Sequence, residues 1–116
     1  MDEVNMFGFG QKAPMNELSP GELEQLMAGD KAVVVDVREP GEFASGHITG
    51  AINRPLSSFD PSALPRAPGK TVVLVCAGGK RSAMALNKCA KAEAAIDTHL
   101  NGGMAAWACA NLPVQR

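Results

Sequence analysis

Two short runs of branched apolar residues constrain the fold of this chain more than any other feature. Residues 32–37 (AVVVDV) and 71–75 (TVVLV) are apolar at consecutive positions instead of alternating with polar residues. A strand with this pattern is buried on both faces, which is typical of the centre of a parallel sheet. The pattern therefore predicts an α/β domain in which helices cover a mostly parallel sheet.

Helix signals alternate with these apolar runs. Residues 19–22 (SPGE) form a capping box with proline at the first helical position, which predicts a helix over residues 20–28. Further helices are expected at 40–44, 82–92 and 104–110, shorter strands at 14–18, 51–53 and 98–101, and mostly loop with one helical turn at the proline-rich residues 55–69. In a sheet of this kind the ligand site lies beyond the carboxyl ends of the strands.

The strongest site candidate is Cys76, which directly follows the run at 71–75. The next residues, 77–82 (AGGKRS), contain two glycines that let the backbone turn tightly and two cations. Because a helix is expected from Ser82, backbone N–H groups and the positive end of the helix dipole would converge on the sulfur. These conditions lower the pKa of a thiol and make it a nucleophile.

Asp36 and Arg38 stand at the end of the other central run. The carboxyl ends of parallel strands meet at one edge of a sheet, so these residues are expected near Cys76. Asp36 is expected to accept hydrogen bonds from turn amides or to pair with Arg38. Either arrangement gives the two residues a supporting role close to the site.

The length and net charge of the chain limit the kinds of protein it can be. At 116 residues, with 46% hydrophobic residues, the chain forms one domain with a real core. Residues 1–12 are expected to be a flexible N-terminal extension, and residues 13–116 the folded domain. The net charge of −1 gives no reason to expect nucleic-acid binding, and no apolar stretch approaches the ~18 residues of a membrane span. The N-terminus begins acidic and lacks an apolar signal core, so a cytoplasmic location is expected.

The remaining cysteines and the histidines are expected to be structural. Cys76, Cys89 and Cys109 form no Cys-x-x-Cys pair, and an odd count without a secretion signal predicts free thiols. Cys89 and Cys109 are expected to be packing residues, since no spacing supports a resolving role. His47 is interpreted as a turn histidine satisfied by the backbone, and His99 as a residue of the surface or of an edge strand. Neither histidine lies at the spacing of a metal finger.

Several separated motifs of this chain resemble those of the rhodanese domain, in the same order. They are residues 36–39 (DVRE), 42–43 (EF), 46–53 (GHITGAIN), 76–82 (CAGGKRS), 102–107 (GGMAAW) and 112–114 (LPV). The resemblance runs from about residue 17 to the C-terminus. It implies a three-layer α/β fold in which helices flank a central, mostly parallel, five-stranded sheet.

The resemblance also implies a sulfurtransferase activity. The family's cysteine takes a sulfane sulfur from a donor such as thiosulfate, holds it as a persulfide and passes it to a thiol, a protein acceptor or cyanide. On this chain the carrier is Cys76, and the residues that line the substrate site are Ala77, Gly78, Gly79, Lys80, Arg81 and Ser82. Arg81, with Lys80, would hold an anionic donor. The resemblance implies no metal and no cofactor.

Two alternatives are kept. Cysteine phosphatases, some of which share the rhodanese fold, and arsenate reductases use a longer loop than the four residues between Cys76 and Arg81. A phosphatase also needs a proton donor for its leaving group, and the sequence places neither Asp60 nor Glu39 in that role. The other alternative is a non-catalytic or sensory rhodanese module that binds a protein partner. The retained cysteine, with its full loop, argues against that reading.

Overall fold

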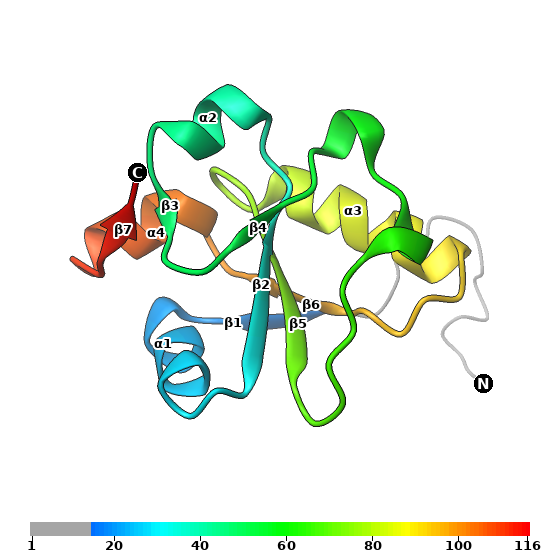
Figure 1. Cartoon of the computed structure of the whole chain (residues 1–116), viewed down its shortest axis with the longest axis horizontal. Helices are drawn as coiled ribbons and strands as arrows, with labels where there is room; N and C mark the ends of the chain where they lie inside the picture. Colours follow the sequence, from blue (N-terminus) through cyan, green and yellow to red (C-terminus); the bar gives the residue numbers. More distant parts are fainter. Residues whose placement is uncertain (1–14) are drawn as a thin grey trace, which may run out of the picture.

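A computed structural model describes residues 15–116, and its centre is a five-stranded sheet (Figure 1). The strands lie in the order β1-β6-β5-β2-β4. Their bounds are β1 (Asn16–Leu18), β2 (Ala32–Asp36), β4 (Ile52–Asn53), β5 (Thr71–Val75) and β6 (Thr98–Leu100). All pairings within this sheet are parallel. The predicted α/β class with a five-stranded sheet is confirmed, whereas the extension predicted at residues 1–12 lies outside the described residues.

Helices cover both faces of the sheet and make three layers (Figure 1). They are α1 (Pro20–Ala28), α2 (Pro40–Ala44), α3 (Lys80–Lys91) and α4 (Gly103–Cys109), with single 3₁₀ turns at Leu56–Ser58 and Pro61–Ala63. Leu86 of α3 packs with Val35 and Leu74 on one face. Leu23 of α1 and Trp107 of α4 pack on the other face. Successive residues of a central strand therefore point into two separate cores on opposite faces of the sheet. This is why residues 32–37 and 71–75 are apolar almost throughout.

Two local predictions are wrong. The helix expected from Ser82 begins at Lys80, because Gly79 adopts a left-handed φ of 107° and ends the loop there. His47, expected in a turn, lies in β3 (His47–Ile48), which pairs antiparallel with β7 (Val114–Gln115) in a second, two-stranded sheet. Strands of this length carry no detectable periodicity, and their pairing depends on contacts distant in sequence.

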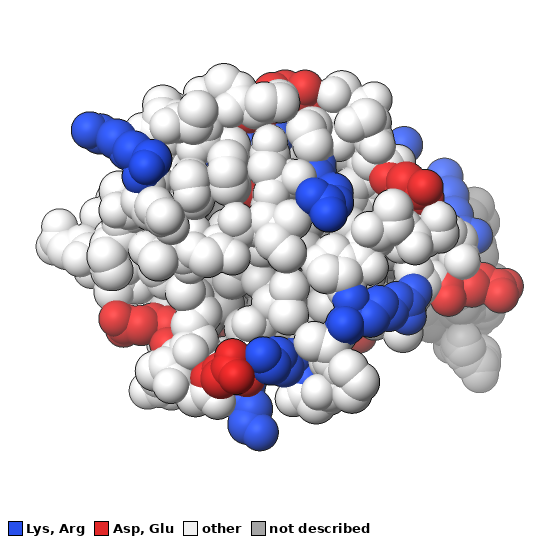
Figure 2. Space-filling model, in the orientation of Figure 1, with Lys and Arg blue, Asp and Glu red and all other residues white. Residues whose placement is uncertain are grey.

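Charged side chains of both signs are scattered over the face shown in Figure 2, mostly towards its periphery, and much of the face is uncharged. Within residues 15–116, no helix is long and apolar enough to cross a membrane.

Candidate active site at the carboxyl end of the sheet

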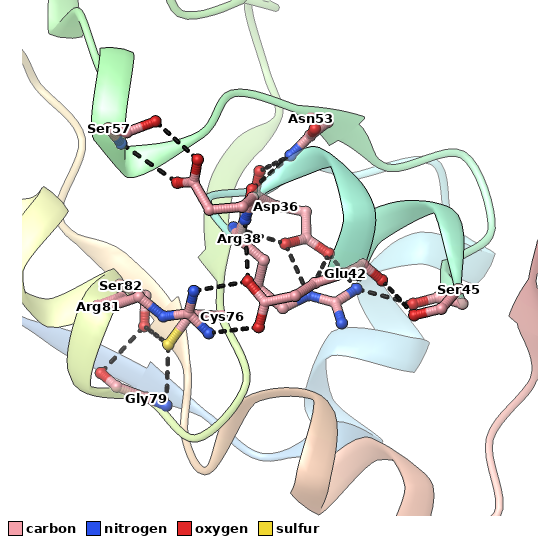
Figure 3. Close-up of polar contacts among 12 residues, drawn as sticks. Asp36, Arg38, Glu42, Ser45, Asn53, Ser57, Cys76, Gly79, Arg81 and Ser82 are labelled. Atoms are coloured by element: carbon pink, nitrogen blue, oxygen red, sulfur yellow. Dashed lines mark hydrogen bonds and ion pairs between the residues drawn. The ribbon is translucent and has the colours of Figure 1, made fainter.

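Cys76 leads the loop between β5 and α3, and its side chain belongs to the core on the α3 face. The residue is only 1% exposed. Its Sγ accepts a hydrogen bond from the Gly79 N–H at 3.0 Å and lies 3.5 Å from the Ser82 hydroxyl oxygen. Figure 3 shows these two contacts as dashed lines from the sulfur to Gly79 and Ser82. The loop therefore surrounds a buried thiol with hydrogen-bond donors.

The environment of this thiol favours its ionised form. Burial on its own raises the pKa of Cys76, but hydrogen bonds from the Ser82 side chain and from the Ser82, Gly79 and Gly78 backbone amides outweigh it. The pKa of Cys76 is therefore lowered from its ordinary value. Each of these donors stabilises a thiolate more than a thiol. The sequence placed residues 77–82 around the sulfur, and of these Gly78, Gly79 and Ser82 are the ones that donate to it.

The amino end of α4 holds the other side of the cysteine loop. The Met104 and Ala105 amides donate to the carbonyl oxygens of Cys76 and Ala77 at 2.8 and 3.0 Å. This close approach is possible only because Gly103 has no side chain. A Cβ built there would overlap the Cys76 carbonyl oxygen and lie 2.8 Å from the Ala77 carbonyl carbon. The Gly102-Gly103 pair thus lets one loop dock directly on another.

Arg81 does not stand free at the site. Its two terminal nitrogens donate to the two carboxylate oxygens of Glu42 in α2, at 2.7 and 2.9 Å (Figure 3). Glu42 raises the pKa of Arg81, and the neighbouring Cys76 charge adds to this effect. Lys80 is exposed at the rim of the loop. The sequence suggested an anion-binding role for Arg81 but did not identify Glu42, because the two residues lie far apart in the chain.

We expect the Glu42–Arg81 pair to make stability depend on pH in acid. The Arg81 side chain, followed by the Glu39 amide, lowers the pKa of Glu42 from 4.5 to about 2. The folded state thus resists protonation, so the contribution is complete above pH 4.5 and is lost as the pH falls towards 2. Because the Glu42 side chain is 41% exposed, solvent screens the pair and its contribution stays below about 1 kcal/mol.

Urea unfolding of the wild type and of Glu42→Gln measures this dependence. The difference in unfolding free energy between the two proteins should be present at pH 7 and should shrink steadily below pH 4.5. Glu24→Gln, at an exposed position of α1, is the matched control and should show no such difference. A Glu42→Gln difference that stays constant down to pH 2.5 would contradict the assignment.

A buried ion pair supports the neighbouring strand end. The Asp36 carboxylate accepts hydrogen bonds from the Arg38 amide at 2.9 Å, from Nε at 3.0 Å and from Nη2 at 2.8 Å. Arg38 also donates to the Gly46 carbonyl oxygen at 2.7 Å, and the Asn53 side chain donates to the carbonyl oxygens of both members (Figure 3). Asp36 aligns with Val75 across the sheet, so the pair lies beside the strand that leads to Cys76.

His99 is where sequence reasoning failed most clearly. It was expected on the surface or on an edge strand, but it is 3% exposed, and β6 lies between β1 and β5. Its Nδ1 lies 2.7 Å from the Ser82 hydroxyl oxygen, and its Nε2 lies 3.1 Å from a carboxylate oxygen of Glu17. Its position just before Gly102-Gly103 was visible in the sequence, but the order of the strands was not.

The other residues that were predicted to be structural have different outcomes. Cys89 is fully buried in the α3 core, where burial raises its pKa, as expected of a packing residue. Cys109 is a free thiol but is exposed, so the packing role expected for it is wrong. The backbone partner predicted for His47 is present, since its Nδ1 lies 2.8 Å from the Phe43 carbonyl oxygen. Residues 15–116 contain no cluster of three or more His, Cys, Asp or Glu side chains that could hold a metal ion.

Known proteins resemble this chain in sequence and in fold. An uncharacterized protein of Synechocystis sp. is 47% identical over 96 residues, which cover 83% of this chain and 54% of that protein. The probable adenylyltransferase/sulfurtransferase MoeZ of Mycobacterium tuberculosis is 40% identical over 101 residues, which cover 84% of this chain and 26% of MoeZ. This chain thus spans about half and about a quarter of the lengths of these two relatives.

Shorter relatives match over most of their length. A protein of Allochromatium vinosum named sulfurtransferase is 32% identical over 86% of this chain and 94% of its own. The crystal structure of a rhodanese-related protein from Thermoplasma volcanium superposes with a TM-score of 0.75 at 29% identity, covering 86% of this chain and 97% of the other. The family model of the rhodanese-like domain matches residues 19–110. This chain therefore belongs to the rhodanese-like domain family.

Proposed function

We propose that this protein is a sulfurtransferase that carries a sulfane sulfur on Cys76 as a persulfide. The donor is thiosulfate or another persulfide-type compound, and the acceptor is a thiol, a protein thiol or cyanide. The observation that carries the proposal is the buried Cys76 thiol, whose pKa is lowered by backbone amides and by Ser82. Relatives named as sulfurtransferases support the same reaction class.

The reaction consists of two displacements at sulfur. The Cys76 thiolate attacks the outer sulfur of thiosulfate, the sulfur–sulfur bond of the donor breaks, and sulfite leaves with the electron pair. The acceptor thiolate or cyanide then attacks the outer sulfur of the persulfide, and Cys76 is released again as a thiolate. A nucleophile with a lowered pKa serves both steps, because only the thiolate attacks and a stable thiolate leaves readily.

The loop residues take distinct roles in this scheme. The amides of Gly78, Gly79 and Ser82 stabilise negative charge on sulfur before and after transfer. Lys80 and Arg81 place positive charge where an anionic donor must approach, although Glu42 already neutralises part of the Arg81 charge. The exposed residues Ala77 and Gly78 lie at the rim of the loop, where an acceptor thiol of another protein could reach it.

The carboxylates considered for phosphatase chemistry are occupied by local contacts. A carboxylate oxygen of Glu39 accepts a hydrogen bond from the Ser57 hydroxyl at 2.7 Å. Asp60 accepts hydrogen bonds from the amide and the hydroxyl of Ser62. With these partners and the short loop, sulfur transfer fits the site better than phosphoryl transfer.

Intact mass measured before and after incubation with thiosulfate tests the proposal. The reduced wild type should gain one sulfur atom, and cyanide should remove it. Cys76→Ser should gain none, whereas Cys89→Ser and Cys109→Ser should load like the wild type. Loading that persists in Cys76→Ser would assign the carrier to another cysteine. If no sulfur donor loads the wild type, the alternative of a non-catalytic module that binds a protein partner is favoured. Hydrolysis of an aryl phosphate would instead favour a phosphatase.

A further inference from the structure

A line of polar contacts runs from the Cys76 sulfur, which follows the central strand β5, through the protein to the edge strand β1. Cys76 Sγ lies 3.5 Å from Ser82 Oγ, Ser82 Oγ lies 2.7 Å from His99 Nδ1, and His99 Nε2 lies 3.1 Å from a Glu17 oxygen. Ser82 and His99 are 0% and 3% exposed, whereas the Glu17 side chain is 54% exposed. The line thus connects a buried thiol, through two buried side chains, to a carboxylate in contact with solvent.

The sheet register explains how these residues meet. His99 of β6 aligns with Glu17 of β1 on one side and with Leu74 of β5 on the other. Residues aligned in parallel strands project to the same face, and Cys76 follows Leu74 by two positions, so it shares that face as well. Ser82 reaches the same place from the first turn of α3. The arrangement is therefore built into the strand order and does not depend on a mobile loop.

The hydrogen atoms carried by these side chains allow two arrangements in which every polar group along the line has a hydrogen-bond partner. The Ser82 hydroxyl has one hydrogen and three acceptors within reach: Cys76 Sγ, His99 Nδ1 and the Gly79 carbonyl oxygen at 3.1 Å. When Cys76 is a thiol, its S–H donates to Ser82, Ser82 donates to Nδ1, and Nε2–H donates to the Glu17 carboxylate. When both nitrogens of His99 carry hydrogen, Nδ1–H donates to Ser82, and the Ser82 hydroxyl is free to donate to a Cys76 thiolate. Every group on the line is satisfied in both states.

We propose that His99 accepts the thiol proton of Cys76 through the Ser82 hydroxyl, and that Glu17 holds the resulting imidazolium. In this step the S–H bond of Cys76 breaks and an O–H bond forms on Ser82. The former Ser82 hydrogen passes to Nδ1 of His99, so no atom is oxidised or reduced. The product is a thiolate and an imidazolium joined by a hydroxyl, which resembles the paired thiolates of cysteine nucleophiles. His99 is thus a positioning residue that acts on the sulfur through Ser82.

The charges around the line fit this assignment. From β1, Glu17 faces His99 and offers the partner that a buried imidazolium requires. From α3, Arg81 lies close enough to Cys76 for their charges to interact, but Glu42 of α2 binds its two terminal nitrogens. The proton that leaves Cys76 therefore has an acceptor inside the protein, and the thiolate does not depend on Arg81 alone. The purpose of this relay rests on the proposed function, but thiol ionisation can be measured without any sulfur donor.

The pH dependence of Cys76 alkylation by iodoacetamide tests the relay. A Cys109→Ser background removes the exposed thiol, and peptide mass identifies the modified residue. His99→Asn keeps an amide that can bond to Ser82 but cannot take up a proton. It should move the midpoint of the rate profile up by about one pH unit, which slows alkylation about tenfold at pH values well below the midpoint. Glu17→Gln should move it in the same direction by less, and His47→Asn, the matched control, should leave it unchanged.

The relay would be overturned if His99→Asn had the melting temperature of the wild type and its alkylation rate had the same pH dependence as that of the wild type. Should His99→Asn fail to fold, the imidazole nitrogens followed by NMR in Cys76→Ala provide a second test. Without the thiolate, His99 should lose its proton at a lower pH than in the wild type, and an unchanged midpoint would again overturn the relay. Sulfur loading, measured by intact mass, is a test independent of the alkylation profile. Loading with an unshifted alkylation profile refutes only the relay, and a shifted profile without loading refutes only the sulfur transfer.

Discussion

Gly103→Ala is expected to lower the free energy of unfolding by about 3 kcal/mol or more. The residue has a left-handed φ of 58°, which alanine adopts only with strain. The added methyl group would also overlap the Cys76 carbonyl oxygen, so α4 and the cysteine loop would have to separate. In a domain of this size such a loss lowers Tm by about 10–20 °C. Thermal and urea unfolding measure the effect directly.

Gly21→Ala is the matched control. Gly21 lies in the first turn of α1, and a Cβ built there meets nothing within 4 Å. The substitution should therefore leave stability unchanged or raise it by up to about 1 kcal/mol. We further expect Gly103→Ala, but not Gly21→Ala, to slow alkylation of Cys76, because the separated loop would no longer point its amides at the sulfur. Equal stabilities for the two variants would show that α4 does not hold the loop as described.

Arg38→Met is the second substitution with a large expected effect. It leaves the Asp36 carboxylate, which is 1% exposed, without its guanidinium partner. Removing one member of a buried ion pair costs about 3–5 kcal/mol, because the remaining charge is buried and uncompensated. The Gly46 carbonyl oxygen also loses its bond to Arg38. Urea unfolding at neutral pH should show the loss, and Asp36→Asn in the Arg38→Met background should recover part of it by removing the stranded charge.

An exposed pair of the same protein gives the comparison. Lys70 lies 2.9 Å from Asp30, whose side chain is 85% exposed. Lys70→Met should leave the unfolding free energy nearly unchanged, because solvent screens the pair and the carboxylate stays hydrated without it. If Arg38→Met proved as mild as Lys70→Met, the Asp36–Arg38 pair would not be the support of β2 that its contacts indicate.

Local chemistry explains which parts of this structure the sequence could predict. The two central strands were evident because their residues face apolar layers on both sides. The start of α1 was evident because Ser19 and Glu22 bond to each other's backbone amides within four residues. The Asp36–Arg38 pair was anticipated for the same reason, since only one residue separates the partners. Its role at the site stays a prediction.

The features that could not be predicted depend on which segments become neighbours. The burial of His99 follows from the place of β6 between β1 and β5, and no local pattern encodes that order. Glu42 and Arg81 meet only because α2 and α3 both start at the carboxyl edge of the sheet. The pairing of β3 with β7 joins two-residue strands from distant parts of the chain. Of the cysteine loop, the sequence indicated the donors but not the clamp from α4.

The amides of Met104 and Ala105 that hold the cysteine loop also impose an order on the protein's synthesis. A ribosome delivers the amino-terminal part of a chain first, so Cys76 emerges before α4 does. On a nascent chain that stops short of this helix, the carbonyl oxygens of Cys76 and Ala77 lack these two donors. The contacts that fix the loop are therefore complete only after the carboxyl-terminal segment has emerged and docked.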